Sequence, residues 1–233
     1  MTDPGTSPRL CRVAVLSALT FSILLAAPAV QAGPATDQLR NRVDRILQVL
    51  SDPEMAKESR TVERRAALRR IAGEVFDFNE ISRRSLGRYW QPRTPAEREE
   101  FVRLFADLLE RAYVSKLELY SGEKIEYPGE VPDGDVTTVR TRIITKQGTP
   151  IPVDYRMFQQ GGQWRAYDAL IEGVSLVANY RTQFNSVIQR TSYEDLVKTL
   201  RAKAQEGAPP PPGKGPASGD RATPASATRP QTP

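Results

Sequence analysis

The chain of 233 residues has no histidine and a single cysteine, Cys11. Without histidine it can form neither a Ser-His or Cys-His nucleophilic pair nor a metal site with imidazole ligands. One cysteine excludes a disulfide framework within the chain and a thiolate zinc site. From the residues alone we therefore expect no catalytic residue of these types, no metal and no cofactor.

The first 32 residues have the composition of a secretory signal. A short basic start precedes an uncharged apolar run from Val13 to Ala27, and the small residues Val30 and Ala32 fit the positions before a cleavage site. This run is shorter than the roughly 20 residues that a membrane-spanning helix needs. We predict a cleaved signal peptide over residues 1–32, with an uncleaved membrane anchor as the alternative.

The other end of the chain, residues 207–233, is rich in proline and glycine and has no aromatic or large aliphatic side chain. Such a segment cannot bury enough apolar surface to offset the entropy lost when it becomes ordered. We therefore predict a disordered tail over these residues.

The segment between the two ends, residues 33–206, is close to neutral. The whole chain has a net charge of 33 − 28 = +5, and the ends hold five basic and two acidic residues, which leaves +2. This small charge predicts no nucleic-acid partner. The densest basic cluster is Arg60, Arg64, Arg65, Arg69 and Arg70. It is typical of a solvated helix face with i,i+4 ion pairs, and a docking patch for an acidic partner or an anionic lipid surface is the alternative.

Helical periodicity dominates the first half of this segment. Apolar spacing predicts helices over residues 39–50 and 68–76, the first beginning after Thr36 or Asp37. Thr94-Pro95-Ala96-Glu97 combines a cap, a proline at the first helical position and a glutamate at the third, which predicts the start of a long helix. Further helices are predicted after Asp77, from Val174 and after Ser192.

Between residues 124 and 171 the period changes to two, which is typical of strands. The alternation predicts strands at Lys124–Tyr127, Val136–Thr145, Ile151–Phe158 and Gln163–Ile171, with Gly161-Gly162 as a two-residue hairpin loop. The order predicts an α+β fold over residues 33–206. In this fold, N-terminal and C-terminal helices pack on one face of a roughly four-stranded antiparallel sheet.

Few side chains in the sequence suggest chemical reactivity. Asp154 and Asp168 lie in neighbouring predicted strands and could form a carboxylate pair for acid–base chemistry. Arg156 and Arg165 lie on the same strands, however, and cross-strand ion pairing is the commoner outcome. Bulky apolar residues are far more prominent, and their periodicity fits a filled core as well as a ligand cavity.

Four separated motifs occur in order along the chain. They are FDFNEISRRSLG at Phe76–Gly87, YSGE at Tyr120–Glu123, WRAYD at Trp164–Asp168 and IEGVSLVANYRTQF at Ile171–Phe184. Together with Trp90 and the Thr94-Pro95 helix start, they closely resemble the MlaC family, also called toluene-tolerance periplasmic proteins. The resemblance covers roughly residues 36–204.

This resemblance implies a periplasmic phospholipid carrier without a catalytic residue, and we expect a monomer. Members of the family shuttle phospholipid between an outer-membrane lipoprotein–porin complex and an inner-membrane ABC transporter complex, and so help to maintain outer-membrane lipid asymmetry. The resemblance also implies an apolar acyl-chain cavity between the helices and the sheet. One alternative is a small α+β pocket enzyme of isomerase or dehydratase type, using Asp154, Asp168 or a tyrosine. An export chaperone or lipoprotein carrier is another.

Period and aromatic density select the residues that would line such a cavity. We expect the acyl chains to contact Phe101, Phe105, Leu108, Tyr113, Val153, Tyr155, Trp164, Val174, Val177 and Tyr180. We expect the phosphate near the mouth to contact Arg140, Arg142 and Arg181, for which a plain surface position is the alternative.

Overall fold

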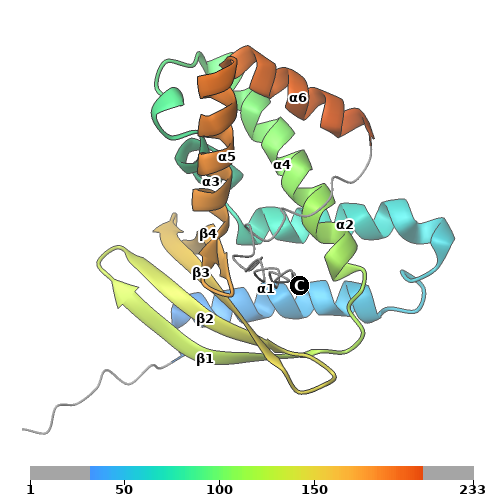
Figure 1. Ribbon diagram of the computed structural model, residues 1–233. Coiled ribbons are helices and arrows are strands. Elements are labelled where there is room, and N and C mark those ends of the chain that lie inside the picture. Colours follow the sequence, from blue (N-terminus) through green and yellow to red (C-terminus); the bar gives the residue numbers. More distant parts are fainter. Residues whose placement is uncertain (1–31, 207–233) are drawn as a thin grey trace, which may run out of the picture.

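A computed structural model describes residues 32–206, which fold into helices and one sheet (Figure 1). The predicted tail, and the predicted signal peptide apart from Ala32, lie outside these residues. The helices are α1 (Pro34–Ser51), α2 (Thr61–Val75), α3 (Phe78–Leu86), α4 (Pro95–Leu117), α5 (Leu176–Arg190) and α6 (Tyr193–Glu206), with short 3-10 helices η1 (Glu58–Arg60) and η2 (Gly87–Tyr89). None of the helices within residues 32–206 is long and apolar enough to cross a membrane.

The sheet has five strands in the order β1-β2-β3-β4-β5, and all neighbouring strands are antiparallel. The strands are β1 (Lys124–Asp133), β2 (Val136–Ile144), β3 (Pro150–Gln160), β4 (Gln163–Ile171) and β5 (Val174–Ser175). The predicted α+β fold is confirmed, with one strand more than expected. Since β5 has only two residues, it is too short to leave an alternating pattern in the sequence.

The predicted hairpin loop between β3 and β4 is confirmed. Gln160 pairs with Gln163, so Gly161 and Gly162 alone form the turn. Their φ angles of +55° and +77° lie in the left-handed region, which glycine adopts without steric cost.

Polar caps begin three helices where the sequence predicts them. At the start of α4, Thr94 Oγ1 accepts a hydrogen bond from Glu97 N at 3.3 Å, and the Glu97 carboxylate accepts one from Thr94 N at 2.7 Å. At the start of α3, the Asp77 carboxylate accepts from Glu80 N at 2.8 Å. Before α6, Ser192 Oγ accepts a backbone N–H in the same way.

The start of α1 differs from the prediction, because the helix begins at Pro34 rather than after Thr36 or Asp37. The residue before it, Gly33, has no side chain, and the cap comes from β1 instead. The Glu130 carboxylate accepts hydrogen bonds from the backbone N (2.8 Å) and Oγ1 (3.0 Å) of Thr36. A Cβ on Gly33 would lie 2.1 Å from Glu130 Oε1, so a larger residue would displace this cap. A cap that comes from 94 positions away leaves no local sequence signal.

Other boundaries also differ from the predicted ones, among them the end of β1 and the start of α5. β1 continues past Tyr127 to Asp133. The predicted strand ends too early because a bulge between Glu126 and Gly129 interrupts the alternation of side chains. The predicted helix from Val174 begins two residues later, at Leu176, and Val174 belongs to β5. In the first case the bulge hides the length of β1 from a pattern of period two, and in the second β5 is too short to show such a pattern.

The elements form two lobes (Figure 1). The sheet lobe consists of the sheet with α1 and α2, and the helical lobe consists of α3, α4, α5 and α6. The hydrophobic core is divided in the same way, with one buried cluster among the helices of the helical lobe and another between α1, α2 and the sheet. Phe76, which follows α2, packs against both clusters and so joins the two cores.

Candidate functional site

The ten residues predicted to line a cavity divide between the two lobes. Phe101, Phe105, Leu108, Val177 and Tyr180 are buried in the helical-lobe cluster, with Tyr113 packed against it. Tyr155 and Trp164 pack against the sheet-lobe cluster, and Val153 is buried on β3. Val174, on β5, is 63% exposed, whereas the other nine are buried or half-buried.

Some of these aromatic residues pack closely against one another. The ring of Phe105 meets those of Tyr180 and Phe184 edge to face, with centroids 4.9 and 5.0 Å apart. The ring of Phe101 meets that of Phe184 at 5.6 Å, and both Phe101 and Phe105 are fully buried. These two phenylalanines therefore hold α4 against α5 within the helical lobe.

Several tyrosines lie in surroundings of low polarity. Burial raises the pKa of Tyr155 and of Tyr180 to about 12, and it also raises the pKa of Tyr113 and of Tyr127. Tyr113, Tyr127 and Tyr155 nevertheless keep part of their surface accessible. Tyr113 and Tyr155 thus lie at the margins of the two buried clusters, one beside each.

Tyr127 is a member of this group that the sequence pattern does not single out. It lies in the β1 bulge, where the alternation breaks. Its Oη is buried and has no hydrogen-bond partner among residues 32–206, while the Arg40 guanidinium stands 4.7 Å over the ring. A buried hydroxyl without a partner is uncommon in folded proteins, and a ligand oxygen would satisfy it.

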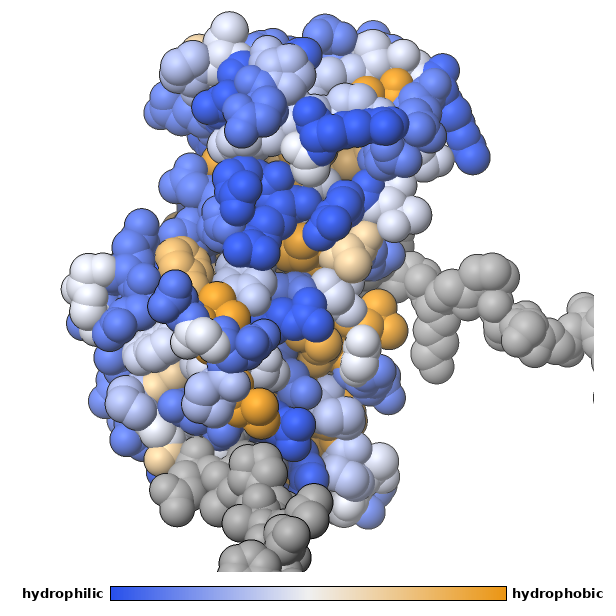
Figure 2. Space-filling view, turned by 90° about the vertical axis from the view of Figure 1, so that its left-hand side faces the viewer, coloured by the Kyte–Doolittle hydropathy of each residue, from blue (hydrophilic) through white to orange (hydrophobic). Residues whose placement is uncertain are grey.

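Hydrophobic surface is unevenly distributed over the molecule. On the face shown in Figure 2, hydrophobic residues gather at the narrowing between the two lobes and over the sheet lobe, while the helical lobe is largely hydrophilic. On this face, apolar side chains therefore reach the surface at the junction between the lobes as well as over the sheet lobe.

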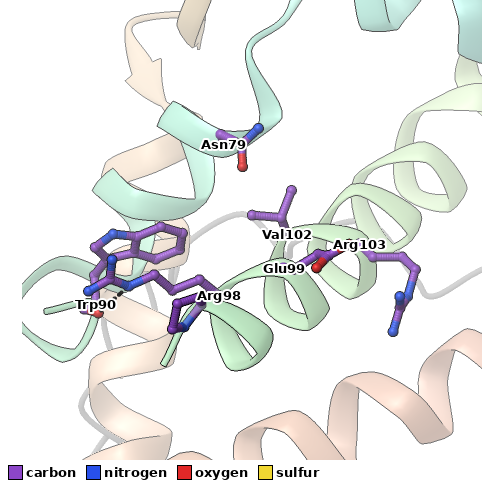
Figure 3. A pocket seen from close by; sticks show the side chains of 7 residues that line it. Asn79, Trp90, Arg98, Glu99, Val102 and Arg103 are labelled. Carbon is purple, nitrogen blue, oxygen red and sulfur yellow. Dashed lines mark hydrogen bonds between the residues drawn. The ribbon is translucent and has the colours of Figure 1, made fainter. Parts of the chain in front are cut away.

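Two surface cavities lie on the helical lobe. One, of about 480 Å³, is lined by Asn79, Trp90, Pro95, Arg98, Glu99, Val102 and Arg103 (Figure 3). The other, of about 370 Å³, is lined by Leu86, Gly87, Arg88, Tyr89, Arg181, Thr182 and Asn185. Neither is lined by a predicted acyl-chain residue, and both have arginine-rich linings that are poorly suited to hydrocarbon.

The two aspartates considered for acid–base chemistry do not face each other. In the register of β3 and β4, Asp154 lies opposite Leu170, and Asp168 lies opposite Arg156. The predicted cross-strand ion pair is confirmed for Arg156 and Asp168, at 3.4 Å, whereas Arg165 donates to a backbone carbonyl on α2.

Asp168 has a structural role at the start of α5. It is 3% exposed and accepts hydrogen bonds from Ser175 Oγ at 2.6 Å and Val177 N at 3.0 Å. Ser175 in turn caps α5 by accepting a hydrogen bond from Ala178 N. With both oxygens engaged, this carboxylate fixes the helix to β4 and is poorly placed to exchange protons with a substrate.

The basic cluster of α2 is largely paired with α4. Arg64 and Arg65 bind the Glu118 carboxylate at 3.0 and 3.1 Å, and Arg69 binds Glu110 at 2.5 Å. No predicted i,i+4 pair of this cluster forms among the described residues, and Arg60, just before α2, binds Glu63 three positions on. We call Arg64, Arg65, Arg69, Glu110 and Glu118 the α2–α4 ion-pair cluster, and it connects the sheet lobe to the helical lobe.

The three arginines predicted to contact phosphate are not brought together. Arg140 and Arg142 are exposed on β2, on the face opposite to the buried Val139 and Thr141. They therefore point away from α1 and α2. Arg181 is exposed on α5 and lines the 370 Å³ cavity.

The model of the MlaC protein family matches residues 40–202. The chain belongs to the MlaC family. Its MlaC relatives include the toluene tolerance protein ttg2D of Pseudomonas putida, 30% identical over 142 residues, which are 60% of this chain and 66% of that protein. They also include the intermembrane phospholipid transport system binding protein MlaC of Haemophilus influenzae, 25% identical over 126 residues, which are 52% of this chain and 59% of that protein. The chain thus spans less than two thirds of the length of either relative.

A solved structure has the same fold. It is that of a phospholipid-binding protein from Ralstonia solanacearum in complex with a phospholipid, with 24% sequence identity and a TM-score of 0.66. The likeness covers 75% of this chain and 98% of the other. A solved protein therefore adopts the α+β architecture described above over nearly its whole length.

Proposed function

We propose that the protein is a periplasmic phospholipid carrier rather than an enzyme. It would shuttle phospholipid between an outer-membrane lipoprotein–porin complex and an inner-membrane ABC transporter complex, and so maintain outer-membrane lipid asymmetry. The observation that carries the proposal is the fold shared over nearly the whole Ralstonia protein, which holds a phospholipid. Membership of the MlaC family agrees with it.

We place the acyl chains between the two lobes. Support comes from the divided core, whose two clusters only Phe76 contacts together among residues 32–206, and from the partly accessible rings of Tyr113 and Tyr155, one beside each cluster. The unpaired Tyr127 hydroxyl would supply a hydrogen bond to an ester or phosphate oxygen of the lipid. The hydrocarbon chains themselves have no hydrogen-bonding groups and need no polar partner.

The energy of transfer explains why such a carrier needs no chemistry. Burying one methylene contributes about 0.8 kcal/mol, so a chain of about 16 carbons represents roughly 12 kcal/mol. The same chain is equally buried in a bilayer. The large terms nearly cancel when lipid passes between a membrane complex and the protein, whereas loss of the lipid to water is strongly disfavoured.

We propose that lipid enters on the side of the α2–α4 ion-pair cluster. These ion pairs connect the lobes and are partly open to solvent, with Arg65 and Arg69 side chains 51% and 65% exposed. Exposed ion pairs contribute little to stability, so they separate at low cost. The opposite connection, through Asp168, is buried.

The direct test is mass spectrometry of organic extracts from the protein purified under mild conditions. We expect phospholipid in amounts comparable to the protein. Extracts without phospholipid would contradict the proposal, and co-purified lipoproteins in its place would indicate a lipoprotein carrier.

A substitution tests where the chains lie. Val153→Trp would place a bulky ring on the buried face of β3, and we expect a clear fall in the lipid bound per protein. Val62→Trp, on a residue that is 83% exposed, is the control and should not change loading. Circular dichroism and thermal melting show whether each variant is folded. A folded Val153→Trp protein with unchanged loading would remove Val153 from the site.

A further inference from the structure

The 370 Å³ cavity between η2 and α5 carries positive charge that nothing in its lining compensates. Arg88 and Arg181 line it, and no acidic residue does. Neither arginine forms a salt bridge within residues 32–206. The 480 Å³ cavity differs, because Glu99 lines it, and its Arg98 donates to the backbone carbonyls of Trp90 and Gln91 (Figure 3).

The backbone at the end of α3 shapes this cavity. Gly87 has φ +57° and ψ −126°, a conformation that residues with a Cβ rarely adopt, and it turns the chain from α3 into η2. Arg88 and Tyr89 follow at once and meet α5, where the Arg88 guanidinium donates to Tyr89 Oη at 2.8 Å and to Asn185 Oδ1 at 3.2 Å. Tyr89 Oη also donates to Asn185 Oδ1, at 3.3 Å.

These hydrogen bonds leave several donors for a ligand. Arg181 lies one helical turn before Asn185, so the two side chains share one side of α5. The Arg181 guanidinium and the Asn185 amide nitrogen make no hydrogen bond within the described residues, and Arg88 uses one of its nitrogens. Two guanidiniums and an amide thus line one cavity, and the hydroxyl of Tyr89 bonds to Arg88 and to Asn185.

We propose that this cavity is an anion site that binds a phosphate group. Guanidiniums bind phosphate through paired, charge-assisted hydrogen bonds, and a tetrahedral phosphate offers acceptors to donors on several sides. The phosphate could belong to a phospholipid headgroup at a membrane surface or to a small free phosphate. The site goes beyond lipid carriage and does not depend on it, because its lining is separate from the residues between the lobes.

The test uses Arg181→Gln and Arg88→Gln/Arg181→Gln, with Arg140→Gln/Arg142→Gln as a control that removes the same charge from the outer face of the sheet. In one arm, thermal melting follows a titration with inorganic phosphate against sodium chloride of equal ionic strength. In the other, the protein is sedimented with phosphatidylglycerol vesicles and with phosphatidylcholine vesicles.

We expect binding by the wild type in at least one arm, and about 10- to 100-fold weaker binding by the double variant, as for a lost charged hydrogen bond. The control should bind as the wild type does. Binding to inorganic phosphate identifies a free phosphate as sufficient, and binding to vesicles alone identifies the headgroup in its membrane. No wild-type binding in either arm, or an equal loss in the control, would overturn the proposal. Lipid extraction from the same samples reports on the carrier function separately.

Discussion

The two connections between the lobes are built on different principles. On the β4 side, Asp168 is buried and binds Ser175, Val177 and Arg156, so it fixes α5 to the sheet through several contacts. On the α2–α4 side, the contact consists of ion pairs whose arginines are partly exposed. Breaking a buried network leaves uncompensated polar groups, whereas breaking a solvated pair mainly exchanges it for water.

This difference assigns separate tasks to the two sides. The Phe76 segment reinforces the β4 side, since Asp77 N donates to Ala166 O at 2.9 Å and Phe76 packs in both cores. If the β4 side stays bonded while the α2–α4 ion pairs break, the lobes can separate on the α2–α4 side and keep their relative orientation. On our proposal, such a molecule would admit a lipid between the lobes and close over it again.

The largest effect is expected from Asp168→Ala, which removes the centre of the β4 connection. It leaves the Ser175 hydroxyl, the Val177 amide and the Arg156 guanidinium without their acceptor. We expect the free energy of unfolding to fall by about 3 kcal/mol, measured by urea denaturation.

Asp154→Ala is the matched control for that prediction. Asp154 lies on β3 opposite Arg140 and is partly exposed, so its loss should change the free energy of unfolding by no more than about 0.5 kcal/mol. Equal effects of the two substitutions would show that the β4 connection is no stronger than an ordinary surface contact.

A smaller effect on stability, but a larger one on exchange, is expected from Glu118→Gln. This substitution weakens the pairs with both Arg64 and Arg65. We expect a loss of about 0.5–1 kcal/mol in the free energy of unfolding. If opening occurs on this side, transfer of a fluorescent phospholipid to vesicles should become about 2- to 5-fold faster, which is the same energy expressed as a rate.

The control for the exchange experiment is Glu63→Gln. It removes the pairing with Arg60, which lies just before α2 and does not connect the lobes. This variant should transfer lipid at the wild-type rate. Faster transfer in both variants, or in neither, would separate the entry route from the α2–α4 ion-pair cluster.

How far the sequence predicts this molecule depends on how local each cause is. The start of α4 is predicted correctly because its cap, Thr94, and the partner of that cap, Glu97, are three residues apart in the sequence. The start of α1 is predicted wrongly because its cap, Glu130, comes from β1, far away in the sequence. β5 is missed because two residues carry no period.

The candidate site shows the same limit. Periodicity finds Phe101, Phe105 and Tyr180 as inward-facing residues, and the structure buries all three. It does not reveal how two such faces meet, so it does not single out Tyr127 in its bulge, and the assignment of the exposed Val174 to the site stays a prediction. The ion pairs between the α2 arginines and α4 distinguish the two connections between the lobes. They are tertiary contacts, so the sequence of neither helix predicts them.

The smallest expected effect is that of pH on the α2–α4 ion-pair cluster. The hydrogen bond from Arg65, together with the one from Arg64, holds the pKa of the Glu118 carboxyl below its ordinary value, although partial burial opposes this. A carboxyl whose pKa is lowered by folding contributes stability that is fully present above its unfolded pKa, about 4.3, and is lost as the pH falls through its folded pKa. The difference in the free energy of unfolding between the wild type and Glu118→Gln should therefore be constant from about pH 7 to pH 5 and shrink below about pH 4. Urea denaturation across this range measures it. A difference that persists undiminished to pH 3 would mean that Glu118 acts through its shape and hydrogen bonds rather than through its charge, and the α2–α4 side would then resemble the β4 side more closely than its exposure suggests.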